Sequence, residues 1–393
     1  MKIDLLYELQ PGTRQDNHAV FEQAIEHIIL ADEAGFDTVW MVEHHFLGVP
    51  GGLALSCAPE VWLGLLAART KRIRLGQGCV LLPYQFNHPV RVAERAAMVD
   101  HLSNGRLELG MARSSFYEQE GFGADPAETR RSFEEALKII PRMFQEEGEF
   151  SHQGEFLTIP PRAILPKPVQ KPHPPLWYAA TSRPSFELAG RSGVGLLAMT
   201  IFQTLPELQR LIESYREAAR QVKPVGAYIN NELGVFTLAH CAESMDAARQ
   251  NQGPENIVAY LRICLHLVAA GLDPNSMEES LRKFGDGDPG NPYGAMPLSA
   301  FVEKAARGDW TFADVDEHDM VVLGDPETCI DKLERYAEIG ADRVLCLMQL
   351  NALDHDAVMR SIRLFGEHVI PHFSAPERRD GCALSPSPLV SPR

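Results

Sequence analysis

The chain has 393 residues, more than one ordinary domain needs, although a (β/α)8 barrel of about 250 residues can exceed about 400 with insertions. Its 53 acidic and 37 basic side chains give a formal net charge of −16, which disfavours binding to nucleic acid or to an anionic membrane surface. Apolar residues make up 45% of the chain, and no apolar run reaches the roughly 18 residues of a membrane-spanning helix.

Seven cysteines are scattered along the chain, and no pair has Cys-x-x-Cys spacing. This usage is typical of reduced thiols rather than of a disulfide framework. The first residues run directly into an apolar segment that carries Asp4 and Glu8, so we expect no secretory leader and a cytoplasmic protein. The H-E-x-x-H spacing of a helical zinc site is missing, and we expect no metal.

Eight apolar runs of strand length recur along the chain, and most lack the alternation of a strand with one solvent-facing side. Such runs are typical of parallel strands that are buried on both faces. The predicted strands are 3–9, 38–42, 73–82, 107–112, 176–180, 194–200, 233–241 and 343–350.

Helical patterns separate these runs. In the first, Phe21, Ile25 and Ile28 fall on one face, and Gly35 marks the end of the helix. The other predicted helices are 58–70, 89–102, 128–144, 185–191, 205–221, 326–339 and 354–369. Eight β–α repeats in order predict an α/β fold, and they favour a closed (β/α)8 TIM barrel over an open doubly wound sheet.

Three segments do not fit the β–α repeat pattern. Residues 147–175 are rich in proline, glycine and histidine and are typical of an ordered crossover loop. Residues 273–319 are acidic with a Gly/Pro-rich centre, which indicates an insertion that could serve as a lid. Residues 374–393 are rich in serine and proline and are typical of a disordered tail, which leaves 1–373 as a single domain.

The tetrapeptide Glu43-His44-His45-Phe46 follows the second predicted strand directly. In a barrel this position is the C-terminal mouth, where catalytic side chains lie. A histidine there can act as an acid or a base near neutral pH, which makes His44 the catalytic candidate. The alternative is that both histidines are loop residues at a strand end.

Five segments, in order, resemble the bacterial-luciferase-like family of flavin-dependent monooxygenases, and the resemblance spans nearly all of 1–373. The segments are Val39-Trp40-Met41-Val42-Glu43-His44-His45-Phe46, Gly76-Gln77-Gly78-Cys79-Val80-Leu81-Leu82-Pro83, His88-Pro89-Val90-Arg91, Asp100-His101-Leu102-Ser103-Asn104-Gly105-Arg106-Leu107-Glu108-Leu109-Gly110 and Pro168-Val169-Gln170-Lys171-Pro172-His173-Pro174-Pro175.

The resemblance implies a barrel that binds reduced FMN at its mouth and oxygenates a small organic substrate with O2 through a C4a-(hydro)peroxyflavin. It places His44 beside the flavin as the catalytic histidine and Arg113 on the FMN phosphate. Thr181, Ser182 and Ser185 match further phosphate-binding positions. Gly78 and Cys79 stand where the family often has a non-proline cis peptide under the flavin ring.

The residue chemistry agrees with a phosphate site. Arg113 can give charge-assisted hydrogen bonds to a phosphate, and Thr181-Ser182-Arg183-Pro184-Ser185 opens a helix whose N-terminal amides favour anions. The alternative is that the hydroxyl groups only cap that helix.

The segment Gly285-Asp286-Gly287-Asp288-Pro289-Gly290 has G-x-G-x-x-G spacing, but no strand precedes it and its aspartates would repel a pyrophosphate. It predicts a loop rather than an NAD(P)H site, so reduced flavin would come from a separate reductase.

The family also implies a homodimer, and small residues on helices 58–70 and 89–102 permit close helix approach. Two alternatives remain: a hydride-transfer oxidoreductase of the same fold that uses F420 or flavin, and a non-catalytic flavin-binding subunit.

Overall fold

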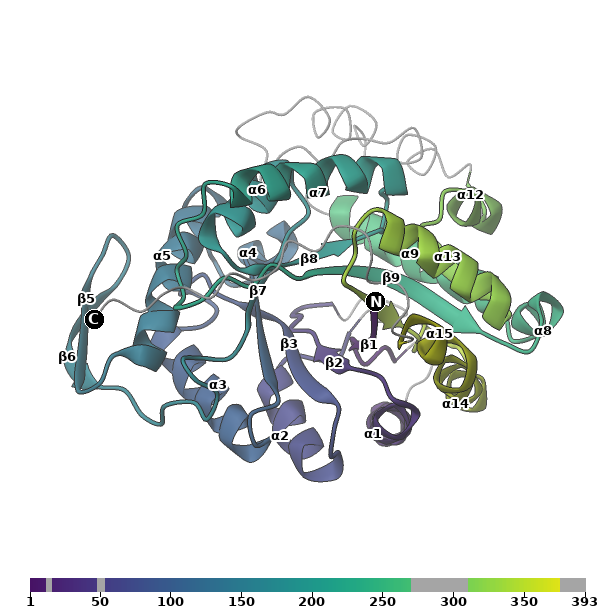
Figure 1. The fold of residues 1–393 in the computed structure, drawn as a ribbon, viewed down its shortest axis with the longest axis horizontal. Helices are drawn as coiled ribbons and strands as arrows, with labels where there is room; N and C mark the ends of the chain where they lie inside the picture. Colours follow the sequence, from purple (N-terminus) through teal and green to yellow (C-terminus); the bar gives the residue numbers. More distant parts are fainter. Residues whose placement is uncertain (12–15, 48–53, 270–309, 375–393) are drawn as a thin grey trace.

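The computed structural model describes residues 1–11, 16–47, 54–269 and 310–374, and its centre is a closed barrel of eight parallel strands (Figure 1). Each strand pairs with the next along the chain, β8 pairs with β9, and β11 pairs back to β1. The barrel strands are β1 Lys2–Tyr7, β2 Thr38–Met41, β3 Arg74–Leu81, β4 Leu107–Ala112, β7 Leu176–Ala179, β8 Gly195–Met199, β9 Leu233–Cys241 and β11 Arg343–Leu347. The predicted TIM barrel is confirmed, and the open doubly wound sheet is wrong.

Helices surround these strands as the sequence predicts (Figure 1). Helix α1 ends at Gly35, whose φ of 94° lies in the left-handed region that glycine favours. The first turns of three helices hold Pro89, Pro206 and Pro326, a position that suits proline. The helices are α1 Asn17–Ala34, α2 Pro59–Arg69, α3 Pro89–Leu102, α4 Phe116–Gly121, α5 Pro126–Gln145, α6 Arg183–Ser192, α7 Leu205–Ala219, α8 Met245–Gln250, α9 Gly253–Ala269, α12 Phe312–Glu317, α13 Pro326–Glu338, α14 His355–Leu364, the π-helical η2 Phe365–Val369 and α15 Ile370–Ser374.

Segment 147–175 contains an antiparallel hairpin of β5 Glu149–Gln153 and β6 Thr158–Ala163, where the sequence predicts only an ordered loop. Figure 1 shows the hairpin projecting away from the barrel strands. The carboxylate of Glu135 on α5 accepts hydrogen bonds from the backbone N–H groups of 155–157 and so fixes the turn. The strands escape prediction because both are largely exposed and too short to show an apolar pattern.

A ninth parallel strand, β10 Val321–Gly324, pairs with the end of β9 beyond the point where β8 stops. The sequence does not predict it, because this apolar run of four residues directly follows the acidic segment 273–319.

The N-terminal end of the barrel is filled by a buried charge cluster around Arg343, whose side chain is 1% exposed. Its guanidinium pairs with Asp4 at 2.9 Å and with Glu232 at 2.6 Å. The indole rings of Trp40 and Trp177 flank it, with centroids 6.0 and 4.9 Å from Cζ. Burial raises the pKa of Asp4 to about 6, although Arg343 opposes this shift. Aromatic rings and paired acids therefore hold one buried cation in place.

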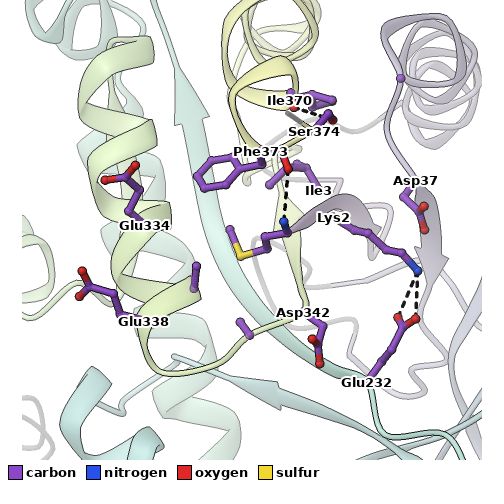
Figure 2. Close-up of a pocket in the computed structure, with 14 residues that line it drawn as sticks. Lys2, Ile3, Asp37, Glu232, Glu334, Glu338, Asp342, Ile370, Phe373 and Ser374 are labelled. Carbon is purple, nitrogen blue, oxygen red and sulfur yellow. Dashed lines mark hydrogen bonds and ion pairs between the residues drawn. The ribbon is translucent and has the colours of Figure 1, made fainter. Parts of the chain in front are cut away.

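A cavity of about 1030 Å³ opens below this cluster, at the N-terminal ends of the strands (Figure 2). Lys2 at the start of β1 pairs with Glu232 in its wall, and the Met1 amino group donates to the Phe373 carbonyl of α15. This cavity lies at the opposite end of the barrel from the predicted active site.

Several predictions fall outside the described residues: most of the insertion 273–319, the Gly285–Gly290 motif and the tail from residue 375 onward. None of the described helices is long and apolar enough to cross a membrane. Within the described ranges the cysteines are free thiols, and no cluster of three metal-ligating side chains occurs.

Candidate active site

The predicted site residues come from four strands and lie at one end of the barrel. His44 follows β2, the Gly78–Cys79 peptide lies near the end of β3, Arg113 follows β4 and Thr181 follows β7. Because all the strands are parallel, their carboxyl ends meet at the same mouth. The structure thus brings together residues that are up to about 140 positions apart in the chain.

The His44 ring lies between two carboxylates. Its Nδ1 is 3.2 Å from Oε1 of Glu118 on α4, and its Nε2 is 3.9 Å from Oε1 of Glu8, which follows β1. The side chain of His44 is 30% exposed, whereas those of Glu118 and Glu8 are 1% and 5% exposed. The imidazole is therefore the accessible member of a largely buried acidic group.

Burial alone would lower the pKa of His44, but the acidic neighbours outweigh it. The hydrogen bond and charge of Glu118, together with the charges of Glu8 and Glu43, raise this pKa to about 9. A histidine at a strand end would ordinarily titrate near neutrality. In the described structure the ring is instead an imidazolium at neutral pH.

Glu118 is surrounded by donors. Its Oε2 accepts from the hydroxyl groups of Ser114 and Ser115 and from the Ser115 N–H, while Oε1 accepts from the His45 N–H and faces His44. Burial would raise the pKa of Glu118, but these hydrogen bonds and the His44 charge lower it to about 2. Glu118 is a fixed anion that orients the His44 ring.

His45 has a different partner from His44, as the alternation of side chains along an extended backbone predicts. Its Nε2 lies 3.1 Å from Oε1 of Glu43. Glu43 also accepts hydrogen bonds from the Leu81 N–H and the Asn87 side chain. His45 is therefore part of the connection between the ends of β2 and β3, and the two histidines are not equivalent.

The Gly78–Cys79 peptide bond is cis, as the family resemblance implies. A Cβ at Gly78 would lie 2.9 Å from the Trp40 side chain, so packing against Trp40 already requires glycine there. Burial raises the pKa of the Cys79 thiol to about 12, which keeps it protonated. Cys79 thus contributes a neutral, weakly polar group to the mouth.

The second half of the site gathers at the start of α6. The hydroxyl groups of Ser182 and Ser185 are both buried and lie 3.0 Å apart. Burial raises the pKa of Tyr178 on β7, while a hydrogen bond with Ser185 and the charge of Arg113 lower it. Ser185 is therefore a hydrogen-bond partner of Tyr178, and the Arg113 charge acts on the same phenol.

Helix α6 begins at Ser182 without a side-chain cap from the described residues, so the alternative that Ser182 caps the helix is not supported. Next to this turn, the Gln203 amide donates to the Thr181 carbonyl at 3.4 Å. The buried Gln203 Oε1 has no hydrogen-bond partner within the ranges that the structure describes. The Gln203 side chain therefore ties its own loop to the turn before α6 and keeps one buried acceptor there.

Sequence reasoning missed the partners of His44. Glu8 lies 36 residues before His44 and Glu118 lies 74 residues after it, and neither belongs to a recognisable motif. One available signal was an acidic residue near the end of a predicted apolar strand, which describes Glu8 in the predicted strand 3–9. Glu118 shows only a serine three residues before it, the spacing of a capping box, which the structure contains.

Comparison with known proteins identifies the family of the chain. A family model described as luciferase-like monooxygenase matches residues 1–343. The chain belongs to the luciferase-like monooxygenase family. It is 26% identical over 386 residues to limonene 1,2-monooxygenase of Rhodococcus erythropolis, which covers 95% of this chain and 87% of that protein. It is 31% identical over 217 residues to the oxygenase component of the flavin-dependent trigonelline monooxygenase of Acinetobacter baylyi, which covers 54% and 58%.

Solved structures share the fold. A monooxygenase from Streptomyces bottropensis superposes with a TM-score of 0.75 at 25% identity, covering 95% of this chain and all of that one. The oxygenating constituent of 3,6-diketocamphane monooxygenase from Pseudomonas putida, in complex with FMN, gives 0.71 at 19% identity, covering 94% and 98%. An F420-dependent secondary alcohol dehydrogenase gives 0.68 at 17% identity, also covering 94% and 98%. The fold therefore occurs with both kinds of cofactor.

Proposed function

We propose that this luciferase-like monooxygenase is the oxygenase of a two-component system, which receives reduced FMN from a separate reductase and uses O2 to oxygenate a small organic substrate. One observation carries the proposal: a half-buried histidine held between two carboxylates lies at the same barrel mouth as a buried Ser182–Ser185 pair near Arg113. The oxygenase component and oxygenating constituent among the relatives support a separate reductase.

The residues at the start of α6 fit the phosphate of FMN. The hydroxyl groups of Ser182 and Ser185 can donate to a phosphate, and Arg113 supplies the positive charge. Pro184 has no N–H, and the N–H groups of Ser185 and Phe186 donate to the Ser182 carbonyl, so the two hydroxyl groups are the main donors of this turn. The Oε1 of Gln203, which has no partner among the described residues, can accept from a ribityl hydroxyl group. Thr181 directly precedes Ser182, and its carbonyl accepts from the Gln203 amide. We assign these residues to the cofactor site.

When bound, reduced FMN supplies the electrons that activate O2. His44 would hold or move a proton at its Nε2, the ring atom that does not face Glu118. Glu118 fixes the orientation of the ring and its Nδ1 proton, and Glu43 fixes the loop that carries His44. Cys79 and the Gly78–Cys79 peptide would lie beneath the flavin ring, with the thiol protonated.

The second candidate is a hydride-transfer oxidoreductase that uses F420, because the fold is shared with an F420-dependent alcohol dehydrogenase. The Glu43-His44-His45-Phe46 segment favours the monooxygenase, since it matches that family's second-strand motif.

An anaerobic titration separates the two candidates. Reduced FMN and reduced F420 are each added to the protein, binding is measured by calorimetry, and O2 is then admitted. We expect reduced FMN to bind and to consume O2 in the complex. Binding of F420 alone, with hydride transfer to an alcohol or ketone and no O2 uptake, would support the alternative.

We also propose a homodimer through α2 and α3. The small residues of these two helices lie mainly in the chain's own core, because Ala67, Ala93, Ala96 and Ala97 are buried. The outer face instead exposes larger apolar side chains: Val61 at 69%, Leu65 at 40%, Met98 at 54% and Leu102 at 62%. A second copy that presents the same face would cover them symmetrically.

Light scattering at micromolar concentration tests the dimer. We expect twice the 43.6 kDa chain mass for the wild type and a monomer for the Met98→Glu/Leu102→Glu variant. A wild-type monomer would refute the dimer.

We further propose that the enzyme works in the cytoplasm, where a reductase can supply reduced flavin.

A further inference from the structure

The two carboxylates beside His44 have different surroundings. Glu118 accepts hydrogen bonds from two serines and from the His45 backbone, in addition to its contact with His44. Glu8, in contrast, accepts within the described residues from the Tyr260 hydroxyl group at 3.0 Å and the Gln10 amide at 2.8 Å. One carboxylate is stabilised as an anion by many donors, and the other is buried with few.

Each of the two carboxylates lies nearest a different nitrogen of the His44 ring. Glu118 faces Nδ1 and Glu8 faces Nε2, so the two oxygens lie on opposite edges of one imidazole. Burial raises the pKa of Glu8, although the His44 charge and both hydrogen bonds oppose the shift. The surroundings thus shift the pKa values of the two carboxylates in opposite directions. The carboxylate with the lowered pKa is suited to remain charged, and the one with the raised pKa is suited to exchange a proton.

We propose that Glu8 is the proton partner of His44, a positioning residue that sets the protonation state of the ring. The assignment rests on the proposed function, since it gives Glu8 a role in the same site. In the step, the Nε2–H bond of the imidazolium breaks and an Oε1–H bond forms on Glu8. The ring becomes neutral and keeps its Nδ1 proton toward Glu118.

The 3.9 Å separation of Nε2 and Oε1 is longer than a hydrogen bond. A small movement of the ring or one bridging water closes it, and catalytic contacts are often long before ligands bind. Tyr260 permits the transfer, because its hydroxyl group can turn from donating to Glu8 to accepting from it. The other groups that face the pair are Glu118 and Glu43 beside His44 and Cys264 beside Glu8.

The first test uses the cofactor-free protein and follows His44 by ¹⁵N NMR during a pH titration. In wild type we expect a titration with two coupled steps. In Glu8→Gln we expect one step at a pH lower by roughly 1 to 3 units, because a close anion is lost. Glu8→Asp should keep most of the wild-type behaviour. A wild-type titration in one step that Glu8→Gln leaves unchanged would overturn the proposal.

Tyr260→Phe is the matched control, because it removes the hydrogen bond to Glu8 and keeps the carboxylate. If Glu8 served only to anchor Tyr260 to β1, Glu8→Gln and Tyr260→Phe would behave alike. We expect them to differ: Tyr260→Phe should keep both steps and move the Glu8 step to higher pH.

In turnover, the pH profile of kcat should lose one limb in Glu8→Gln and regain it in Glu8→Asp. An unchanged profile in Glu8→Gln would overturn the role in catalysis. The NMR result does not depend on the cofactor, so a failure of the FMN proposal and a failure of this one give different outcomes.

Discussion

Both ends of the barrel contain buried charges, but the two clusters differ in how firmly those charges are fixed. At the N-terminal end Arg343 is 1% exposed and lies among acids and two indole rings. At the C-terminal mouth His44 is 30% exposed, and one of its two carboxylates lies beyond hydrogen-bond distance. A permanently charged guanidinium suits a structural core, whereas an imidazole whose charge can change suits catalysis.

The largest expected effect tests the catalytic end. His44→Ala should lower the rate of substrate oxygenation by roughly 10²- to 10⁴-fold, the usual size of acid–base assistance. Its affinity for FMN should be kept, and more H2O2 should be released per FMN oxidised. His45→Ala is the matched control and should change activity less, because His45 contacts Glu43 instead. Wild-type coupling in His44→Ala would make His44 a structural residue.

The next effect tests the structural end. Arg343→Met leaves Asp4 and Glu232 without their buried cation, and we expect the free energy of unfolding to fall by about 3–5 kcal/mol. Urea unfolding measures the change. The double variant with Asp4→Asn should recover part of the loss. If Arg343→Met were as stable as wild type, the charge cluster around Arg343 would not stabilise the N-terminal end of the barrel.

The fold was predictable because each barrel strand is a continuous apolar run that local sequence reveals. The hairpin β5–β6 and strand β10 were not, since the hairpin strands are exposed and β10 has four residues. In the site, motifs indicated His44 and the serines before α6. No motif linked Glu8 or Glu118 to His44, because the segments after β1, β2 and β4 meet only when the barrel closes.

The pKa of His44 and the face available for dimerisation also depend on three-dimensional positions. A histidine at a strand end is expected to titrate near neutrality, and only the three-dimensional positions of Glu118 and Glu8 reveal the rise to about 9. Likewise, the sequence identifies small residues on α2 and α3 but not which face they occupy. The structure shows that the exposed face carries Val61, Leu65, Met98 and Leu102.

A smaller effect tests the phosphate half of the mouth. Arg113→Ala removes a charge-assisted hydrogen bond of about 1.5–3 kcal/mol and should weaken FMN binding by roughly 10- to 150-fold. Riboflavin, which lacks the phosphate, should bind nearly as before. Fluorescence titrations with both ligands measure this difference. Equal losses for FMN and riboflavin would indicate a folding defect rather than a lost phosphate contact.

The smallest effect is a pH dependence of stability. The pKa of His44 is raised in the folded state, so its contribution is fully present below about pH 6.5 and is lost as the pH rises through about 9. His44→Gln should therefore lower the free energy of unfolding by about 1–2 kcal/mol at pH 6, after allowing for solvent screening. The loss should be smaller at pH 10. Urea unfolding of both proteins at pH 6 and pH 10 measures this. Equal decreases in the free energy of unfolding at the two pH values would contradict the account.

A crystal structure of the protein with FMN tests the central claim most directly. We expect the phosphate within hydrogen-bond distance of Arg113 and of the Ser182–Ser185 turn, and the flavin ring between the Gly78–Cys79 peptide and His44. FMN bound away from the C-terminal mouth, or a phosphate that touches neither Arg113 nor the start of α6, would contradict the assignment of this end of the barrel as the active site.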